Sequence, residues 1–207
     1  KWITENGQWK KAVQGYLASL SFADDMVGEL LDALDNGPMA NDTLIIFWGD
    51  HGYHLGEKEN WEKFALWEDT THVPLIIVDP RRTQPGTRCE SPVSLLDLYP
   101  TLVELCGLGL PPQTLEGRSL ANRLTKPGAK SRRVAVTTQG RGNHAVRSSR
   151  HRYIRYADGS EELYDHKTDP HEWNNIAGDP SLAKVKSRLA KRLPTVNAEP
   201  IKIKPRP

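Results

Sequence analysis

Acid, imidazole and ammonium groups gather in one short segment, GDHGYHLGEKENWEKF, at positions 49–64. Asp50 and His51 are adjacent between two glycines, and Lys63 follows near the end of the segment. A carboxylate and a neutral imidazole can both ligate a divalent cation, and glycine lets the backbone approach such an ion closely. Two interpretations stay open from spacing alone: a metal site, or a tight turn in which Asp50 caps the backbone and His51 is hydrogen-bonded.

Three further cationic or protonatable groups follow Asp50 in the same segment: His54, Lys58 and Lys63. An oxyanion bound to a metal needs additional donors that neutralise its remaining oxygens. The segment therefore suits an anion site beside a cation. The alternative for each lysine is a side chain that faces solvent.

The elements around this segment predict α/β organisation. Apolar, β-branched-rich runs at 43–48 and 73–79 are typical of central strands in a parallel sheet, and ligands bind beyond the carboxyl ends of such strands. Segment 49–64 leaves the first strand at that end. Before it, apolar residues recur at steps of three and four from Val13 to Leu34, which predicts a helix with one stripe facing a core and Gly37 at its C-terminal cap.

Aromatic residues at steps of three, Trp61, Phe64 and Trp67, predict a short helix within the candidate site. Its apolar face would pack inward and fix the position of Lys63.

The rest of the chain predicts a second, smaller unit. A helix is expected over 94–109 with Gly107 at its cap, then a short helix before the Pro/Gly/basic connector 125–133. We place the boundary there, with part of an α/β core in 1–130 and a small α+β unit and tail in 131–207. The second unit should hold an antiparallel sheet with an Asp158-Gly159 hairpin turn, a packed helix opened by Asp179-Pro180, and an extended tail over the last dozen residues.

Composition narrows the class of function. The net charge of +2 over 207 residues gives no electrostatic case for nucleic acid or an anionic membrane, and no apolar run reaches the roughly 20 residues that span a bilayer. The two cysteines, Cys89 and Cys106, offer no zinc spacing, and one bridge between them stays open. The N-terminus shows no signal-peptide pattern and no initiator methionine, so we expect the chain to begin within a longer protein.

Four blocks of the chain resemble, in order, the C-terminal half of the type I sulfatases of the alkaline phosphatase superfamily, and within them the iduronate-2-sulfatase-like branch. The blocks are YLASLSFADDMVGELLDALD, LIIFWGDHGYHLGEKENWEKFALWEDTTHVPLII, SLLDLYPTLVELCGL and HAVRSSRHRYIRYADGSEELYDHKTDPHEWNN, and the likeness covers roughly residues 12 to 193. The resemblance implies an alkaline-phosphatase-like mixed or parallel sheet flanked by helices, plus a small C-terminal antiparallel sheet with a packed helix.

The resemblance also implies roles for individual residues. Asp50 and His51 match a late pair of metal ligands, with calcium as the ion, and Lys63 matches a lysine that contacts the sulfate and stabilises the departing oxygen. The other residues carried over as substrate contacts are Tyr53 and Phe64 beside the sulfate, His54 in the anion site, and His144 and Arg147 near the sugar. For His144 and Arg147 an ordinary strand surface is the alternative.

The chain departs from the family in two respects: it lacks the early Asp-Asp metal pair, and it lacks the formylglycine motif that should follow that pair. The Cys-x-Pro/Ala-x-Arg motif that matures to formylglycine is absent, because ESPV follows Cys89 and GLGL follows Cys106. We therefore expect formylglycine on a missing N-terminal part that completes the site, and we expect the isolated chain to be inactive. The substrate implied is a sulfated carbohydrate, in the periplasm or outside the cell for a bacterium and in the lysosome for an animal. Two alternatives stay open: a phosphoester or phosphonate hydrolase of the same superfamily, and a non-catalytic fragment that binds sulfated glycans.

Overall fold

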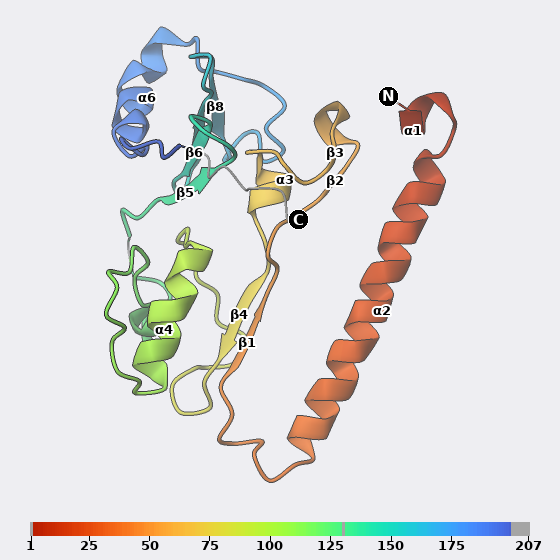
Figure 1. The fold of residues 1–207 in the computed structure, drawn as a ribbon, viewed down its shortest axis with the longest axis vertical. Helices are drawn as coiled ribbons and strands as arrows, with labels where there is room; N and C mark the ends of the chain where they lie inside the picture. Colours follow the sequence, from red (N-terminus) through yellow and green to blue (C-terminus); the bar gives the residue numbers. More distant parts are fainter. Residues whose placement is uncertain (1, 130, 200–207) are drawn as a thin grey trace, which may run out of the picture.

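The computed structural model describes residues 2–129 and 131–199 (Figure 1). The predicted tail lies mostly in 200–207, outside the described residues. The chain begins with two α-helices and continues through two short sheets and three α-helices to a four-stranded sheet and a final helix. In chain order the α-helices and strands are α1 (Trp2–Glu5), α2 (Trp9–Asp35), β1 (Ile45–Trp48), β2 (His54–Leu55), β3 (Trp61–Glu62), α3 (Glu68–Thr71), β4 (Leu75–Val78), α4 (Leu98–Leu105), α5 (Ala121–Thr125), β5 (Ala135–Thr138), β6 (His144–Arg147), β7 (His151–Arg155), β8 (Glu161–Asp165) and α6 (Ala183–Ala190).

Helix α2 confirms the predicted helix, but its apolar stripe is not buried. None of its residues is buried among the described residues, and Leu20 and Leu30 are 57% and 70% exposed. Figure 1 shows α2 standing along one side of the molecule, with α1 at its N-terminal end and with α4 and α6 on the opposite side. The expectation that the stripe faces a core is therefore wrong for the described part of the chain. Within that part, no helix is both long and apolar enough to cross a bilayer.

Strands β1 and β4 confirm both predicted runs, but the two strands are antiparallel to each other. Ile45 pairs with Val78 and Trp48 pairs with Leu75. The prediction of parallel strands followed from their two-sided apolar character, which reports burial on both faces rather than direction. Phe47 and Ile76 are 41% and 54% exposed, so nothing among the described residues packs fully on one face of the β1–β4 pair.

The helix predicted from Trp61, Phe64 and Trp67 does not form. Trp61 instead pairs with Leu55 in the β2–β3 hairpin and meets the ring of Trp9 on α2 edge-on, with ring centroids 5.2 Å apart. Phe64 has a φ of 65°, which a right-handed helix cannot contain. The helical turn begins only at Glu68, as α3.

The C-terminal sheet has the predicted antiparallel order β5-β6-β7-β8. Gly159, at a φ of 87°, allows the tight turn between β7 and β8. One face of the sheet packs on α6 through Val146, Tyr153 and Leu189. The opposite face packs Ala145, Ile154 and Tyr164 against Leu66, which joins this sheet to the segment that carries the candidate site.

Helix α4 follows β4 in the chain and packs against α5. It confirms the predicted helix over 94–109, with Gly107 at a φ of 63° after its end. Ser94 and Asp97 form a capping box before it, and the buried Asp97 carboxylate also accepts from Arg133 at 2.7 Å. Cys106, at the end of α4, is exposed and unbridged, as is Cys89.

Candidate active site

Asp50, His51 and Lys63 come together directly after β1. The Nε2 atom of His51 lies 3.5 Å from a carboxylate oxygen of Asp50 and 2.9 Å from Nζ of Lys63. The side chain of Asp50 is 84% exposed and that of His51 is 34% exposed. The three groups therefore share one open corner of the molecule, and an ion or anion can reach all of them.

One backbone contact fixes the orientation of the His51 ring. Its Nδ1 atom lies 2.8 Å from the carbonyl oxygen of Gly52. A carbonyl oxygen only accepts, so Nδ1 carries the proton and Nε2 presents its lone pair toward Asp50 and Lys63. This is the tautomer that a histidine needs to ligate a metal through Nε2.

The residues present fit part of a metal site. Asp50 supplies hard carboxylate oxygens and His51 supplies a correctly oriented imidazole nitrogen. Calcium takes about 6–8 ligands, so these two groups can form only one side of its shell. The remaining ligands would come from outside the described residues.

Close backbone approach explains the glycine after His51. Gly52 donates its N–H to the carbonyl of Thr70 at 2.9 Å, and a Cβ on Gly52 would lie 1.9 Å from the carbonyl oxygen of Asp69. No side chain fits there. The loop after β1 is thus held against α3, which gives His51 a fixed base.

The segment that delivers Lys63 has an unusual backbone. Four of its non-glycine residues have φ between 52° and 72°, a region that L-residues seldom occupy: Lys58, Glu59, Glu62 and Phe64. Such backbone conformations cost free energy and are concentrated at functional sites. Lys63 lies between two of these residues, so its position depends on the whole segment.

Phe64 lies beside Lys63, whereas the ring of Tyr53 contacts helix α2. The Tyr53 ring stacks at a tilt against Tyr16 of α2, with centroids 5.3 Å apart. Phe64 is 72% exposed, and the Lys63 ammonium lies 5.8 Å from its ring centroid. The structure therefore places an exposed aromatic surface beside Lys63.

His54 and Lys58 lie elsewhere. His54 is fully buried, with its ring against Trp67 at a centroid distance of 5.7 Å, so it does not reach the open corner. The Lys58 ammonium hydrogen-bonds the hydroxyl of Tyr164 and the carbonyl of Glu172, and it lies over the Tyr164 ring. The structure separates both groups from the anion site expected from their spacing.

His144 and Arg147 point to opposite faces of the C-terminal sheet. His144 is buried, and its two ring nitrogens lie 2.8 Å from Thr138 Oγ1 and Asn197 Oδ1. Arg147 forms a bidentate pair with Glu68, at 2.9 and 3.0 Å. The ring nitrogens of His144 and the guanidinium of Arg147 thus have partners within the protein. The structure does not bring either side chain to Lys63.

A buried ion cluster holds the site segment against the C-terminal sheet. Arg152 donates from Nε to Glu172 at 2.6 Å, to the carbonyl of Leu66 at 3.1 Å, and from Nη2 to Glu68. Glu172 also accepts from the backbone N–H of Glu68 at 2.9 Å and lies 2.8 Å from His166. Sequence reasoning missed this cluster, because its members are far apart in the chain and charged residues are expected at the surface.

The cluster perturbs the acidity of its carboxylates. Burial acts to raise the pKa of Glu68, but the hydrogen bond from Arg147 and the charges of Arg152 and Arg147 outweigh it and lower this pKa to about 2. Glu68 therefore stays ionised at any physiological pH. The first turn of α3 is anchored by this charge.

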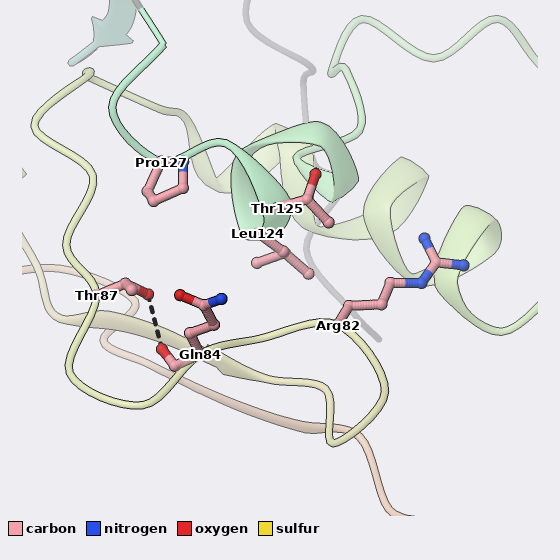
Figure 2. A pocket seen from close by; sticks show the side chains of 6 residues that line it. All are labelled: Arg82, Gln84, Thr87, Leu124, Thr125 and Pro127. Carbon is pink, nitrogen blue, oxygen red and sulfur yellow. Dashed lines mark hydrogen bonds between the residues drawn. The ribbon is translucent and has the colours of Figure 1, made fainter.

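A shallow pocket lies away from this corner. Figure 2 shows it between the loop after β4 and helix α5, with Thr87 donating its hydroxyl to the Gln84 carbonyl at 2.9 Å across its rim. Its lining is Arg82, Gln84, Thr87, Leu124, Thr125 and Pro127. It contains none of the residues that the sequence predicts for the active site.

Comparison with known proteins identifies the family. The sulfatase family model matches residues 2–108, and the model for the C-terminal part of N-sulphoglucosamine sulphohydrolase matches residues 56–199. A sulfatase of Formosa agariphila is 43% identical over 96% of this chain, and human iduronate 2-sulfatase is 38% identical over 50% of it. A structure described as BT4656 in complex with its substrate D-glucosamine-2-N,6-O-disulfate superimposes with a TM-score of 0.76 at 27% identity, over 89% of this chain.

The chain spans about two fifths of the Formosa protein and of the solved structure, at 39% and 40%, and 23% of the human enzyme. The fold is the α/β fold of these neighbours, with the alkaline-phosphatase-like architecture expected from the sequence. The matches run through the candidate site and through the C-terminal sheet alike. The chain belongs to the sulfatase family and corresponds to the C-terminal part of its members.

Proposed function

We propose that this chain supplies the C-terminal side of the active site of a sulfatase that hydrolyses sulfate esters of carbohydrates. The observation that carries the proposal is the convergence of Asp50, His51 and Lys63 on one open corner, with Nε2 of His51 2.9 Å from the Lys63 ammonium. Hydrolysis of a sulfate ester places negative charge on the sulfuryl and departing oxygens, and a fixed cation beside them lowers the barrier.

Each of the three residues has a distinct role in this proposal. Asp50 and His51 hold a divalent cation, with calcium as our candidate. When bound, the cation would neutralise charge on the sulfuryl oxygens. Lys63 donates to a sulfate oxygen and stabilises the oxygen that departs with the alcohol.

Of the remaining predicted residues, some contact the substrate and others hold the surrounding elements in place. Tyr53 and Phe64 line the pocket beside the sulfate, and the exposed ring of Phe64 next to Lys63 supports this role. His144 and Arg147 act indirectly: Arg147 anchors α3 through Glu68, and His144 ties β6 to Asn197. We also propose that His54 does not contact the substrate, since its ring is buried.

A further part of the protein is needed to complete the site. The apolar stripe of α2 and the outer face of the β1–β4 pair are exposed among the described residues, as shown by Leu30, Phe47 and Ile76. These surfaces fit a larger core domain that covers them and carries the formylglycine nucleophile with the other metal ligands. The chain alone should therefore be inactive.

The relatives support the proposed substrate class. One solved neighbour is described with a disulfated glucosamine as its substrate, and one relative is an iduronate 2-sulfatase. A sulfated glycosaminoglycan sugar is accordingly our proposed substrate, including the 2-sulfate of iduronate. Such substrates place the protein in the periplasm or outside the cell of a bacterium, or in an animal lysosome.

The test is hydrolysis by the whole protein, with matured formylglycine and added calcium. Sulfated mono- and disaccharides and an aryl sulfate should release sulfate, and the matching phosphate esters should react far more slowly. Turnover of phosphate or phosphonate esters with no sulfatase activity would instead assign the protein to the alternative hydrolase class. Salt-sensitive binding to heparin-like polymers, without turnover of any ester, would support the non-catalytic alternative.

A further inference from the structure

A second group of potential metal ligands lies beneath the candidate site. Nδ1 of His54 is 3.8 Å from a carboxylate oxygen of Glu57 and 3.8 Å from a carboxylate oxygen of Asp69. Ligand atoms of all three residues lie within 4.8 Å of one another. We propose that His54, Glu57 and Asp69 form a site for a divalent transition-metal ion such as Zn²⁺, distinct from the site at Asp50 and His51.

The state of the His54 ring points to a ligand. The side chain is fully buried, and neither ring nitrogen has a hydrogen-bond partner within the described residues. A buried polar group without a partner is unfavourable, so such groups are rare unless something else satisfies them. An ion between Nδ1 and the two carboxylates would satisfy the nitrogen that faces them.

The distances fit a transition metal. Ligands that sit about 2.0–2.2 Å from one zinc ion, at tetrahedral or trigonal angles, lie roughly 3.3–3.8 Å from one another. The two distances from His54 Nδ1 are both 3.8 Å, at the upper end of this range. They exceed hydrogen-bond length, so the three groups face one another without a direct bond.

The charge and protonation of the cluster also suit a cation. Nδ1 of His54 faces both carboxylates and has no hydrogen-bond partner within the described residues, so it can donate its lone pair to a cation. Two carboxylates supply two negative charges. The positive charge of Lys58 acts in the opposite sense, but its ammonium is held by Tyr164 and Glu172.

The choice of ion follows from the donors. An imidazole nitrogen with two carboxylates favours zinc and its neighbours over calcium or magnesium, which prefer oxygen ligands throughout. The side chains of Glu57 and Asp69 are 41% and 37% exposed, so the ion has a route from solvent. Bound there, it would join β2 to α3 across the segment that carries Lys63.

The test is Zn²⁺ binding to the whole protein by titration calorimetry, with the coordination read by X-ray absorption at the zinc edge. Wild type should bind one Zn²⁺ through one imidazole and carboxylate oxygens, and Asp50→Asn should retain this equivalent. Glu57→Gln and Asp69→Asn should weaken it at least tenfold, and His54→Gln should abolish it. Glu59→Gln, which changes an exposed carboxylate of the same loop, is the matched control and should bind as wild type.

Three results would overturn the proposal. The first is that the wild type binds no Zn²⁺ below millimolar concentration. The second is that Glu57→Gln and Asp69→Asn both bind Zn²⁺ as tightly as wild type. The third is that Asp50→Asn loses the bound Zn²⁺ while Asp69→Asn keeps it. If His54→Gln does not fold, the two partly exposed carboxylates still decide the question. None of these measurements depends on sulfatase activity, so the site and the proposed function can fail separately.

Discussion

The Lys63 ammonium lies 2.9 Å from Nε2 of His51, the same atom that lies 3.5 Å from the Asp50 carboxylate. Since Nδ1 of His51 is committed to the Gly52 carbonyl, Nε2 has one lone pair and cannot serve Lys63 and a metal ion at once. A bound cation would therefore displace the Lys63 ammonium from the imidazole. The released ammonium would be free to donate to an anion beside the metal.

Replacing Lys63 should separate catalysis from metal binding. In the whole protein, Lys63→Ala is expected to lower kcat for sulfate release by about 10²–10³-fold, the usual loss when one donor to a developing oxyanion is removed. Its calcium affinity should be equal to wild type or higher, because a competitor for Nε2 is gone. Lys167→Ala, at an exposed lysine, is the control and should leave both quantities unchanged. A Lys63→Ala enzyme with full kcat would contradict the proposed role.

Replacing Asp50 should affect both properties. Asp50→Asn removes the negative charge but keeps the shape of an exposed side chain, so the fold should persist and the calcium affinity should fall at least tenfold. Sulfatase activity should fall with it and recover in part at high calcium. Asp25→Asn, at an exposed carboxylate of α2, should behave as wild type. Calcium affinity that is unchanged in Asp50→Asn would exclude Asp50 as a ligand.

The sequence allows the elements to be predicted more reliably than their environment. The periodicity of α2, the glycine after α4 and the Asp158-Gly159 turn depend on local backbone chemistry, and all three were confirmed. Periodicity marks the apolar stripe of α2 but not what packs on it, and among the described residues that stripe is exposed. The direction of β1 relative to β4 is absent from a pattern that records only burial.

In the candidate site too, local features could be predicted from the sequence, and features that depend on tertiary packing could not. The proximity of Asp50, His51 and Lys63 could be predicted because the three residues belong to one short segment whose family resemblance is specific. The aromatic spacing of Trp61 and Phe64 misled because the positive φ of Phe64 depends on tertiary packing, which spacing does not record. The cluster around Arg152 could not be foreseen, because it joins residues that are distant in sequence.

Breaking that buried ion cluster should destabilise the protein strongly. Arg152→Met leaves Glu172 buried without its guanidinium partner, which is expected to cost about 3–5 kcal/mol in the free energy of unfolding. Urea unfolding of the whole protein measures it. Arg150→Met removes a more exposed pair, with Asp165, and should cost about 1 kcal/mol or less. Equal losses of unfolding free energy in the two variants would show that the buried cluster stabilises the protein no more than the exposed pair does.

The acidity of Glu68 predicts a specific loss of stability in acid. Its pKa is lowered to about 2 in the folded protein from an ordinary value of 4.5, so its contribution is complete above that ordinary value and disappears as the pH falls toward 2. The contribution is on the order of 3 kcal/mol. Unfolding free energies measured from pH 5 to 2 should fall less steeply in Glu68→Gln than in wild type. Parallel curves for the two proteins would contradict the shift.

The loop after β1 should not tolerate a side chain at Gly52. A Cβ there would lie 1.9 Å from the Asp69 carbonyl oxygen, a backbone atom that cannot move without shifting α3. Gly52→Ala is therefore expected to displace His51, to lower sulfatase activity at least tenfold, and to destabilise the fold by more than about 1 kcal/mol. Gly28→Ala offers the matched control: nothing lies within 4 Å of the added Cβ, and alanine in a helix interior should stabilise α2 by roughly 0.5–1 kcal/mol. Thermal unfolding and sulfate release, measured on both variants, would separate a local clash from a general intolerance of substitution at glycine. If Gly52→Ala kept full activity, the tight contact with α3 would not be what positions His51.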